Sequence, residues 1–164
     1  MRDEVDRLVE AWQRERPDLE PTPMQVLSRV SRLAHHVDRA RRASFAERGI
    51  ESWEFDVLAA LRRAGQPYEL SPGRLIKETL VTSGTMTNRV DRLVAHGLVE
   101  RLPDPRDRRG VLVRLTDEGR ARVDGALASL LERERDLLGG LSGADQERLA
   151  GLLRDLLAPF EPEP

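Results

Sequence analysis

An amphipathic segment followed at once by a proline-bounded pair of strands constrains this 164-residue chain most strongly. Between residues 82 and 96, apolar side chains recur at helical spacing, which predicts a helix with one buried face. These apolar positions are Met86, Val90, Leu93 and Val94. Alternating runs at 98–102 and 111–115 predict two strands, and the prolines within 103–110 predict the turn between them. A two-stranded hairpin is marginal alone, so it must pack against neighbouring helices.

The other face of the predicted helix is polar, and the predicted turn is rich in arginine. Hydroxyl, amide and guanidinium groups can bond base edges and phosphates in a DNA major groove about 12 Å wide, which admits a helix. A projecting turn of arginines suits a narrow minor groove, because guanidinium is weakly hydrated. For the helix alone, an ordinary solvated face is the alternative. The candidate DNA-binding residues are Thr82, Ser83, Thr85, Thr87, Asn88, Arg92, Arg106, Arg108 and Arg109. Asp107 is expected to orient Arg108 or Arg109 through a charge-assisted hydrogen bond.

The turn and its flanks resemble the wing of MarR-family transcriptional regulators. The residues that carry the resemblance are Gly97-Leu98-Val99-Glu100-Arg101, then Asp104-Pro105-Arg106-Asp107-Arg108-Arg109, then Leu115-Thr116-Asp117-Glu118-Gly119. The resemblance extends from about Trp53 to the C-terminal helices. It implies a winged helix-turn-helix in a homodimeric repressor that releases DNA when a small molecule binds. The residue chemistry alone indicates only a module that binds duplex DNA.

Charge and composition limit the alternatives. The net charge is −2, yet residues 82–115 carry seven arginines against four acidic residues, so the positive charge is concentrated there. Lys77 is the only lysine, which makes an arginine in any single loop less informative. The absence of cysteine excludes disulfides, thiolate metal sites and thiol redox sensing. No apolar run approaches the roughly 18–20 residues needed to cross a bilayer, and we expect a cytoplasmic protein without membrane contact.

The remaining pattern predicts a mainly α (α+β) fold. Helices are expected before Pro17, from about 24 to 48, from 52 to 64, and from Ser71-Pro72 to about 78, the last opening the helix-turn-helix. Two further helices, beginning at Thr116 and Ser142, carry leucine stripes. We therefore divide one compact subunit into N-terminal helices (1–50), a winged helix-turn-helix (51–115) and C-terminal dimerisation helices (116–164).

The leucine-striped terminal helices predict an isologous homodimer. The alternative is that they only cover their own head domain. In a dimer, the two recognition helices would enter successive major grooves about 10 base pairs apart and read an inverted repeat in double-stranded DNA.

Four residues resemble the ligand site of the urate-responsive branch of the MarR family: Trp12, Asp56, Arg89 and Arg101. The resemblance rests on an extra N-terminal helix with a tryptophan, an aspartate before the helix-turn-helix, and two arginines twelve positions apart. It implies a pocket for a small anion between the dimerisation region and the DNA-reading lobe. Urate, a purine derivative, a tricarboxylate such as aconitate or citrate, and an aromatic acid all remain open. Alternatively, Trp12 staples the first helix, and Asp56 with Arg89 forms a structural salt bridge.

Other functional classes have weaker support. The sequence contains no nucleophile elbow, phosphate-binding glycine loop or convincing carboxylate pair, so we expect neither an enzyme nor a cofactor. The three histidines, at 35, 36 and 96, lack a zinc-site spacing. A winged helix that binds another protein without sequence-specific DNA binding is the main alternative.

Overall fold

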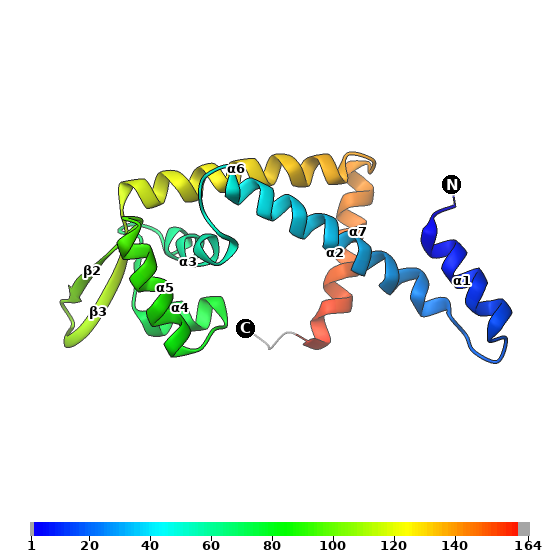
Figure 1. Ribbon diagram of the computed structural model, residues 1–164, viewed down its shortest axis with the longest axis horizontal. Helices are drawn as coiled ribbons and strands as arrows, with labels where there is room; N and C mark the ends of the chain where they lie inside the picture. Colours follow the sequence, from blue (N-terminus) through cyan, green and yellow to red (C-terminus); the bar gives the residue numbers. More distant parts are fainter. Residues whose placement is uncertain (1, 161–164) are drawn as a thin grey trace.

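Two long helices, α2 (Thr22–Ala46) and α6 (Asp117–Leu138), pack against each other and carry a smaller head at one end (Figure 1). The computed structural model describes residues 2–160, except for the side chain of Arg108. The head begins with α3 (Ser52–Arg63), which packs on α6. Phe45 at the end of α2 stacks on Phe55 of α3 with ring centroids 4.2 Å apart. This stack joins the long helices to the core of the head.

The helix-turn-helix consists of α4 (Pro72–Thr79) and α5 (Ser83–Ala95). Ser71 and Thr82 cap these helices, because each hydroxyl accepts a hydrogen bond from the backbone N–H three residues later. Gly97 ends α5 in a left-handed conformation (φ 70°), as predicted. The predicted core positions of α5 are confirmed except for one: Met86, Val90 and Leu93 are buried, but Val94 is 38% exposed. It lies about 100° around the helix from Leu93 and faces away from the core.

The wing is longer than predicted. It consists of β2 (Val99–Asp104) and β3 (Asp107–Leu115), and β3 also pairs with the short strand β1 (Glu69–Leu70), giving the antiparallel order β1-β3-β2. Pro103 pairs with Val111 inside the ladder, so the expectation of a turn throughout 103–110 was wrong. Proline is tolerated there because β2 is an edge strand, whose outer side needs no donor, and a bulge follows directly.

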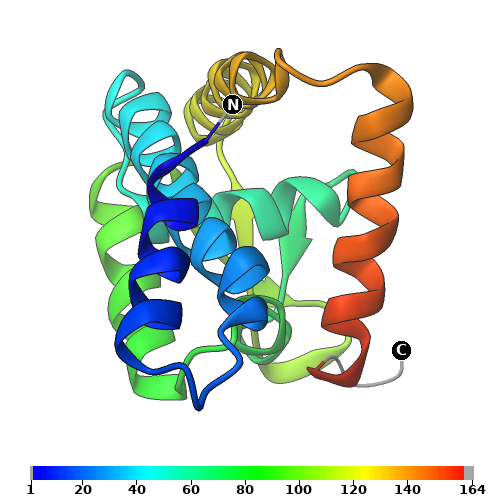
Figure 2. The same ribbon diagram turned by 90° about the vertical axis from the view of Figure 1, so that its right-hand side faces the viewer.

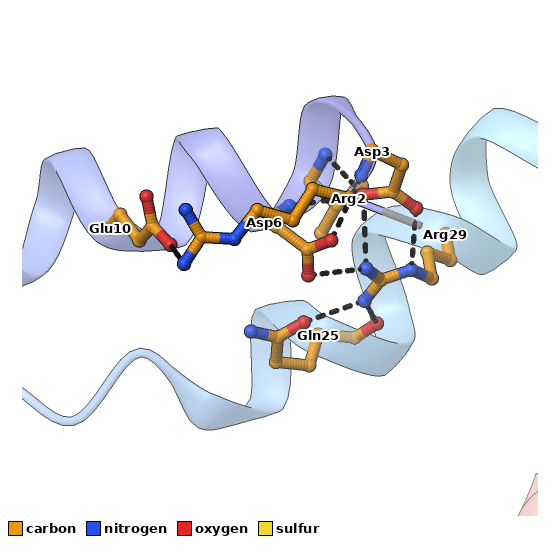
Figure 3. Close-up of polar contacts among 7 residues, drawn as sticks. Arg2, Asp3, Asp6, Glu10, Gln25 and Arg29 are labelled. Carbon is orange, nitrogen blue, oxygen red and sulfur yellow. Dashed lines mark hydrogen bonds and ion pairs between the residues drawn. The ribbon is translucent and has the colours of Figure 1, made fainter.

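At the other end of the molecule, α1 (Glu4–Glu15) lies beside α2 (Figures 1 and 2). Its buried residues are Val5 and Val9, whereas Trp12 is 48% exposed. An ionic network secures the contact: Arg29 of α2 donates to Asp3 (Nε to Oδ2, 2.9 Å) and to Asp6 (Nη2 to Oδ1, 2.7 Å) (Figure 3). Hydrogen bonds from Arg29 and from the Asp6 backbone N–H lower the pKa of the Asp3 carboxyl. The backbone N–H of Asp3 and then Arg29 lower the pKa of Asp6.

The last described elements leave apolar side chains exposed. Helix α7 (Gly143–Leu157), capped by Ser142, and the 3-10 turn Ala158–Phe160 bury no residue against the rest of the described chain. In Figure 2, α7 lies apart from α1 and α2. Leu130 of α6 is buried in the core of the head, whereas the other leucines of these two stripes stay at least partly exposed. Exposed on the two helices are Leu127, Leu131, Leu137, Leu152, Leu156 and Leu157.

Within residues 2–160, no helix is both long and apolar enough to span a membrane. The same residues contain no cluster of three or more histidine, aspartate or glutamate side chains that could hold a metal ion.

Candidate nucleic-acid interface

The N-terminal half of α5 presents a row of exposed polar side chains, which belong to Ser83, Thr85, Thr87 and Asn88. Hydrogen bonds within the start of α5 hold the side chains of Thr85 and Thr87. The hydroxyls of Thr82 and Thr85 lie 2.9 Å apart, and the Thr87 hydroxyl donates to the Ser83 carbonyl at 3.1 Å. Helix α5 begins four residues after α4 ends, which is the close spacing of a helix-turn-helix, a motif whose second helix enters the DNA major groove.

The wing tip forms the second part of the surface. Only Pro105 and Arg106 lie between the strands, and the side chains of Arg106 and Arg109 are exposed. Two carboxylates shape the backbone here: Asp104 accepts from the Arg106 N–H at 2.8 Å, and Asp107 accepts from the Arg109 N–H at 2.9 Å. Asp107 was expected to bond a guanidinium, but its contact among the described atoms is with this backbone N–H. The side chain of Arg108, also expected on this surface, lies outside the described residues.

The base of the wing is braced by an ion pair across the sheet. Arg114 of β3 donates to one carboxylate oxygen of Glu69 of β1, from Nε at 2.9 Å and from Nη2 at 2.7 Å. Gly110 sits where a Cβ would be 2.9 Å from the Cβ of Asp104, so the two wing strands approach closely near the tip. The ion pair therefore braces the base of the wing, and near the tip the two strands lie close together.

The other arginines of α5 face the first turn of α3. The Arg92 guanidinium lies 4.6 Å from the ring centroid of Trp53 and bonds Glu51 at 2.9 Å. The Arg89 guanidinium lies 5.7 Å from the same centroid. The two arginines and Trp53 line a hollow of about 390 Å³ together with Thr85 and Asn88 of the exposed face of α5. Arg92, a candidate DNA contact, is thus also tied to α3.

The four residues of the expected ligand site lie apart within one chain. Trp12 lines an apolar hollow of about 440 Å³ between α1 and α2, at the end of α2 opposite the head. Asp56 pairs with Arg41 of α2 at 3.4 Å, not with Arg89, so the alternative of an Asp56–Arg89 salt bridge was wrong. Arg101 pairs with Asp91 of α5 at 2.6 Å. The sequence could not show this separation, because it depends on the direction in which α1 leaves α2.

Two residues of this region, Glu54 and Trp53, were not predicted to contact α5. Glu54 is 2% exposed: one carboxylate oxygen accepts from the Glu51 N–H, and the other lies 2.8 Å from His96 Nδ1 at the end of α5. The repeat of glutamate at 51 and 54 is a capping-box spacing, which could have indicated the first of these contacts. Trp53 was used only as part of the family resemblance, and nothing local predicted that arginines would cover it.

Comparison with known proteins places these features in context. A model of the MarR family matches residues 48–110. The chain is 39% identical to the HTH-type transcriptional regulator PecS of Dickeya dadantii over 150 residues, which cover 92% of this chain and 90% of PecS. A mutant of Escherichia coli MarR complexed with operator DNA superimposes with a TM-score of 0.65, at 32% identity, covering 81% of this chain and 96% of that one. Bordetella bronchiseptica BpsR, whose DNA binding is regulated by 6-hydroxynicotinic acid, gives a TM-score of 0.58 at 30% identity, covering 78% of this chain and 98% of BpsR.

Proposed function

The chain belongs to the MarR family of DNA-binding transcriptional regulators, and from this premise we propose that it is a homodimeric repressor of an inverted-repeat operator, released by a small anionic metabolite. The observation that carries the proposal is the joint exposure of the polar face of α5 and of the wing arginines Arg106 and Arg109. The first suits a major groove and the second an adjacent minor groove. In this proposal Ser83, Thr85, Thr87 and Asn88 read base edges or phosphates.

The homodimer is supported by the apolar surface that one chain leaves uncovered. Leu152 is 59% exposed, Leu157 50% and Phe160 81%. The helix and the turn that carry them contain no buried residue. Several large apolar side chains exposed on one helix and the turn after it are typical of an interface. A second copy with two-fold symmetry would cover the α7 leucines with the equivalent surface and place two α5 helices on one side of the dimer.

The effector is proposed to be an anion that competes for the ion pairs of the head. Arg89, Arg101 and Arg41 supply the positive charge, and Asp56 would accept a ring N–H or be displaced from Arg41. Trp12 could cover a flat ring only if it came from the second subunit, because α1 lies far from the head of its own chain. An effector that moves Arg89 or the partner of Arg101 acts on α5 itself, which is a direct route to changed spacing of the two DNA-reading heads. The regulation of BpsR by an aromatic acid supports this class of ligand.

The test begins with selection of a duplex from a random DNA pool by the purified protein. We expect an inverted repeat, binding that weakens steeply between about 50 and 200 mM salt, and a dimer in analytical ultracentrifugation. Urate, citrate and 6-hydroxynicotinate are then titrated against the bound duplex, with Arg89→Ala and Asp56→Ala variants as controls. Selection of no preferred sequence would instead favour the winged helix as a protein-binding module. Release by none of the three anions would reject the effector part of the proposal alone.

A further inference from the structure

We propose that the first turn of α3 positions the recognition helix α5 for specific DNA binding. Glu51, Trp53 and Glu54, here called the α3 latch, hold one face of α5 and so fix the orientation in which its polar face meets the bases. The proposal concerns the family's DNA-binding activity and requires neither an effector nor repression.

The latch engages three side chains that share a face of α5. Arg89, Arg92 and His96 follow one another at intervals of three and four residues, so they lie along one side of the helix. Each has a partner in the first turn of α3: the Trp53 ring for Arg89, the Trp53 ring and Glu51 for Arg92, and Glu54 for His96. The contacts span two turns of α5, and a helix held at points along its length cannot roll without breaking one of them.

Glu54 is the anchor of the latch. Its side chain is 3% exposed and both oxygens are hydrogen-bonded, one to the Glu51 N–H and the other to His96. A buried carboxylate holds its partners strongly, since loss of one leaves charge without compensation. The His96 side chain is half exposed and follows the last turn of α5.

The apolar contacts of α5 do not supply this directional control. Helix α5 packs on α4 and β2 through Met86, Val90 and Leu93, and burial of apolar surface is non-directional. Charge-assisted hydrogen bonds and cation–π contacts have defined geometry. Moreover, α3 begins only six residues after α2 ends, so the latch ties the recognition helix to the long-helix scaffold.

The variants that test the latch are His96→Ala and His96→Gln in a Trp12→Phe background. That background leaves Trp53 as the sole tryptophan, so its quenching by acrylamide reports whether α5 still covers it. His96→Gln keeps an amide donor for Glu54, whereas His96→Ala removes it. Glu51→Gln is a third variant that removes the charge paired with Arg92 and leaves the Glu54 side chain and His96 unchanged, so the test survives a folding defect at His96. Urea unfolding checks the stability of each variant.

For each variant, affinity is measured for the selected duplex and for a scrambled duplex of equal length. We expect His96→Ala to lose about tenfold for the selected duplex, to change by less than about twofold on the scrambled one, and to increase Trp53 quenching. His96→Gln should restore most of both properties, and Glu51→Gln should also lower the ratio of specific to non-specific affinity. Equal losses on both duplexes, or unchanged specific binding despite greater Trp53 quenching, would overturn the positioning role and leave the latch as a purely stabilising contact.

Discussion

Among the glycines of the described chain, Gly119 in the first turn of α6 leaves the least room for a Cβ atom. A Cβ built there would lie 2.0 Å from the Leu98 carbonyl oxygen and 2.9 Å from its carbon. The same turn carries the cap of α6, because Thr116 Oγ1 accepts from the Gly119 N–H at 3.0 Å. Replacing Gly119 with alanine must therefore push the start of β2 and the start of α6 apart.

The expected change in the free energy of unfolding is the sum of two losses and one gain. Moving the start of β2 away from the start of α6 by about 1 Å or more lowers the stability by roughly 1–3 kcal/mol, as at other overpacked sites. Distortion of the Thr116 cap adds about 1 kcal/mol. Alanine has a better helix propensity than glycine, which returns up to about 1 kcal/mol. We expect Gly119→Ala to lower the free energy of unfolding by about 2 kcal/mol, or Tm by roughly 4–8 °C for a chain of this size.

The assay is urea unfolding followed by far-UV circular dichroism, at two protein concentrations because the proposed subunit association would contribute to stability. Gly84→Ala in α5 is the matched control: nothing lies within 4 Å of the position that the new methyl group would take, so the substitution should not lower the free energy of unfolding. If Gly119→Ala were as stable as the wild type while Gly84→Ala behaved as expected, the steric reasoning would be refuted.

Two further predictions concern the ends of the molecule. The folded-state pKa values of Asp3 and Asp6 are lowered, so their stabilisation of α1 is present above the ordinary carboxyl pKa and is lost as pH falls through the lowered values. In a Trp53→Phe background, Trp12 fluorescence should report this loss on acidification, and Arg29→Gln should move its midpoint to higher pH; an unmoved midpoint would show that Arg29 does not hold α1. At the wing, Arg109→Ala should weaken binding to selected and scrambled duplexes by similar factors and reduce the salt slope by about 1. An unchanged slope would exclude Arg109 from the phosphates and minor groove.

Four helix starts were predictable because a capping side chain sets each of them, whereas α2 begins at Thr22, two residues before the predicted start, without a side-chain cap. Ser71, Thr82, Thr116 and Ser142 each cap a helix through a bond to a backbone N–H three residues away. The winged helix-turn-helix followed from these caps and from the wing pattern. Strand β1 was not predicted, since two residues carry no periodic signal and pair only because β3 lies beside them.

The candidate site was predictable only where its residues point outward from one element. Exposure of the polar face of α5 and of Arg106 and Arg109 follows from helical and strand periodicity. The α3 latch joins side chains 41 and 42 positions apart, and such partners depend on the packing of whole helices. The remote position of Trp12 likewise depends on the angle between α1 and α2, which no local rule sets.

The close contact at Gly119 also couples the movement of α6 to that of the wing. Besides the close backbone contact, the Thr116 N–H donates to the Leu98 carbonyl at 3.1 Å and the Thr116 hydroxyl donates to the Gly97 carbonyl at 2.8 Å, so β2 and α6 meet without slack. The nine residues of β3 extend about 30 Å at roughly 3.4 Å each. A rotation of α6 by about 5° would then carry the wing tip roughly 2.5 Å, against a minor groove about 6 Å wide. In the proposed homodimer, a rotation of α6 at the subunit interface would therefore move the wing directly relative to the DNA.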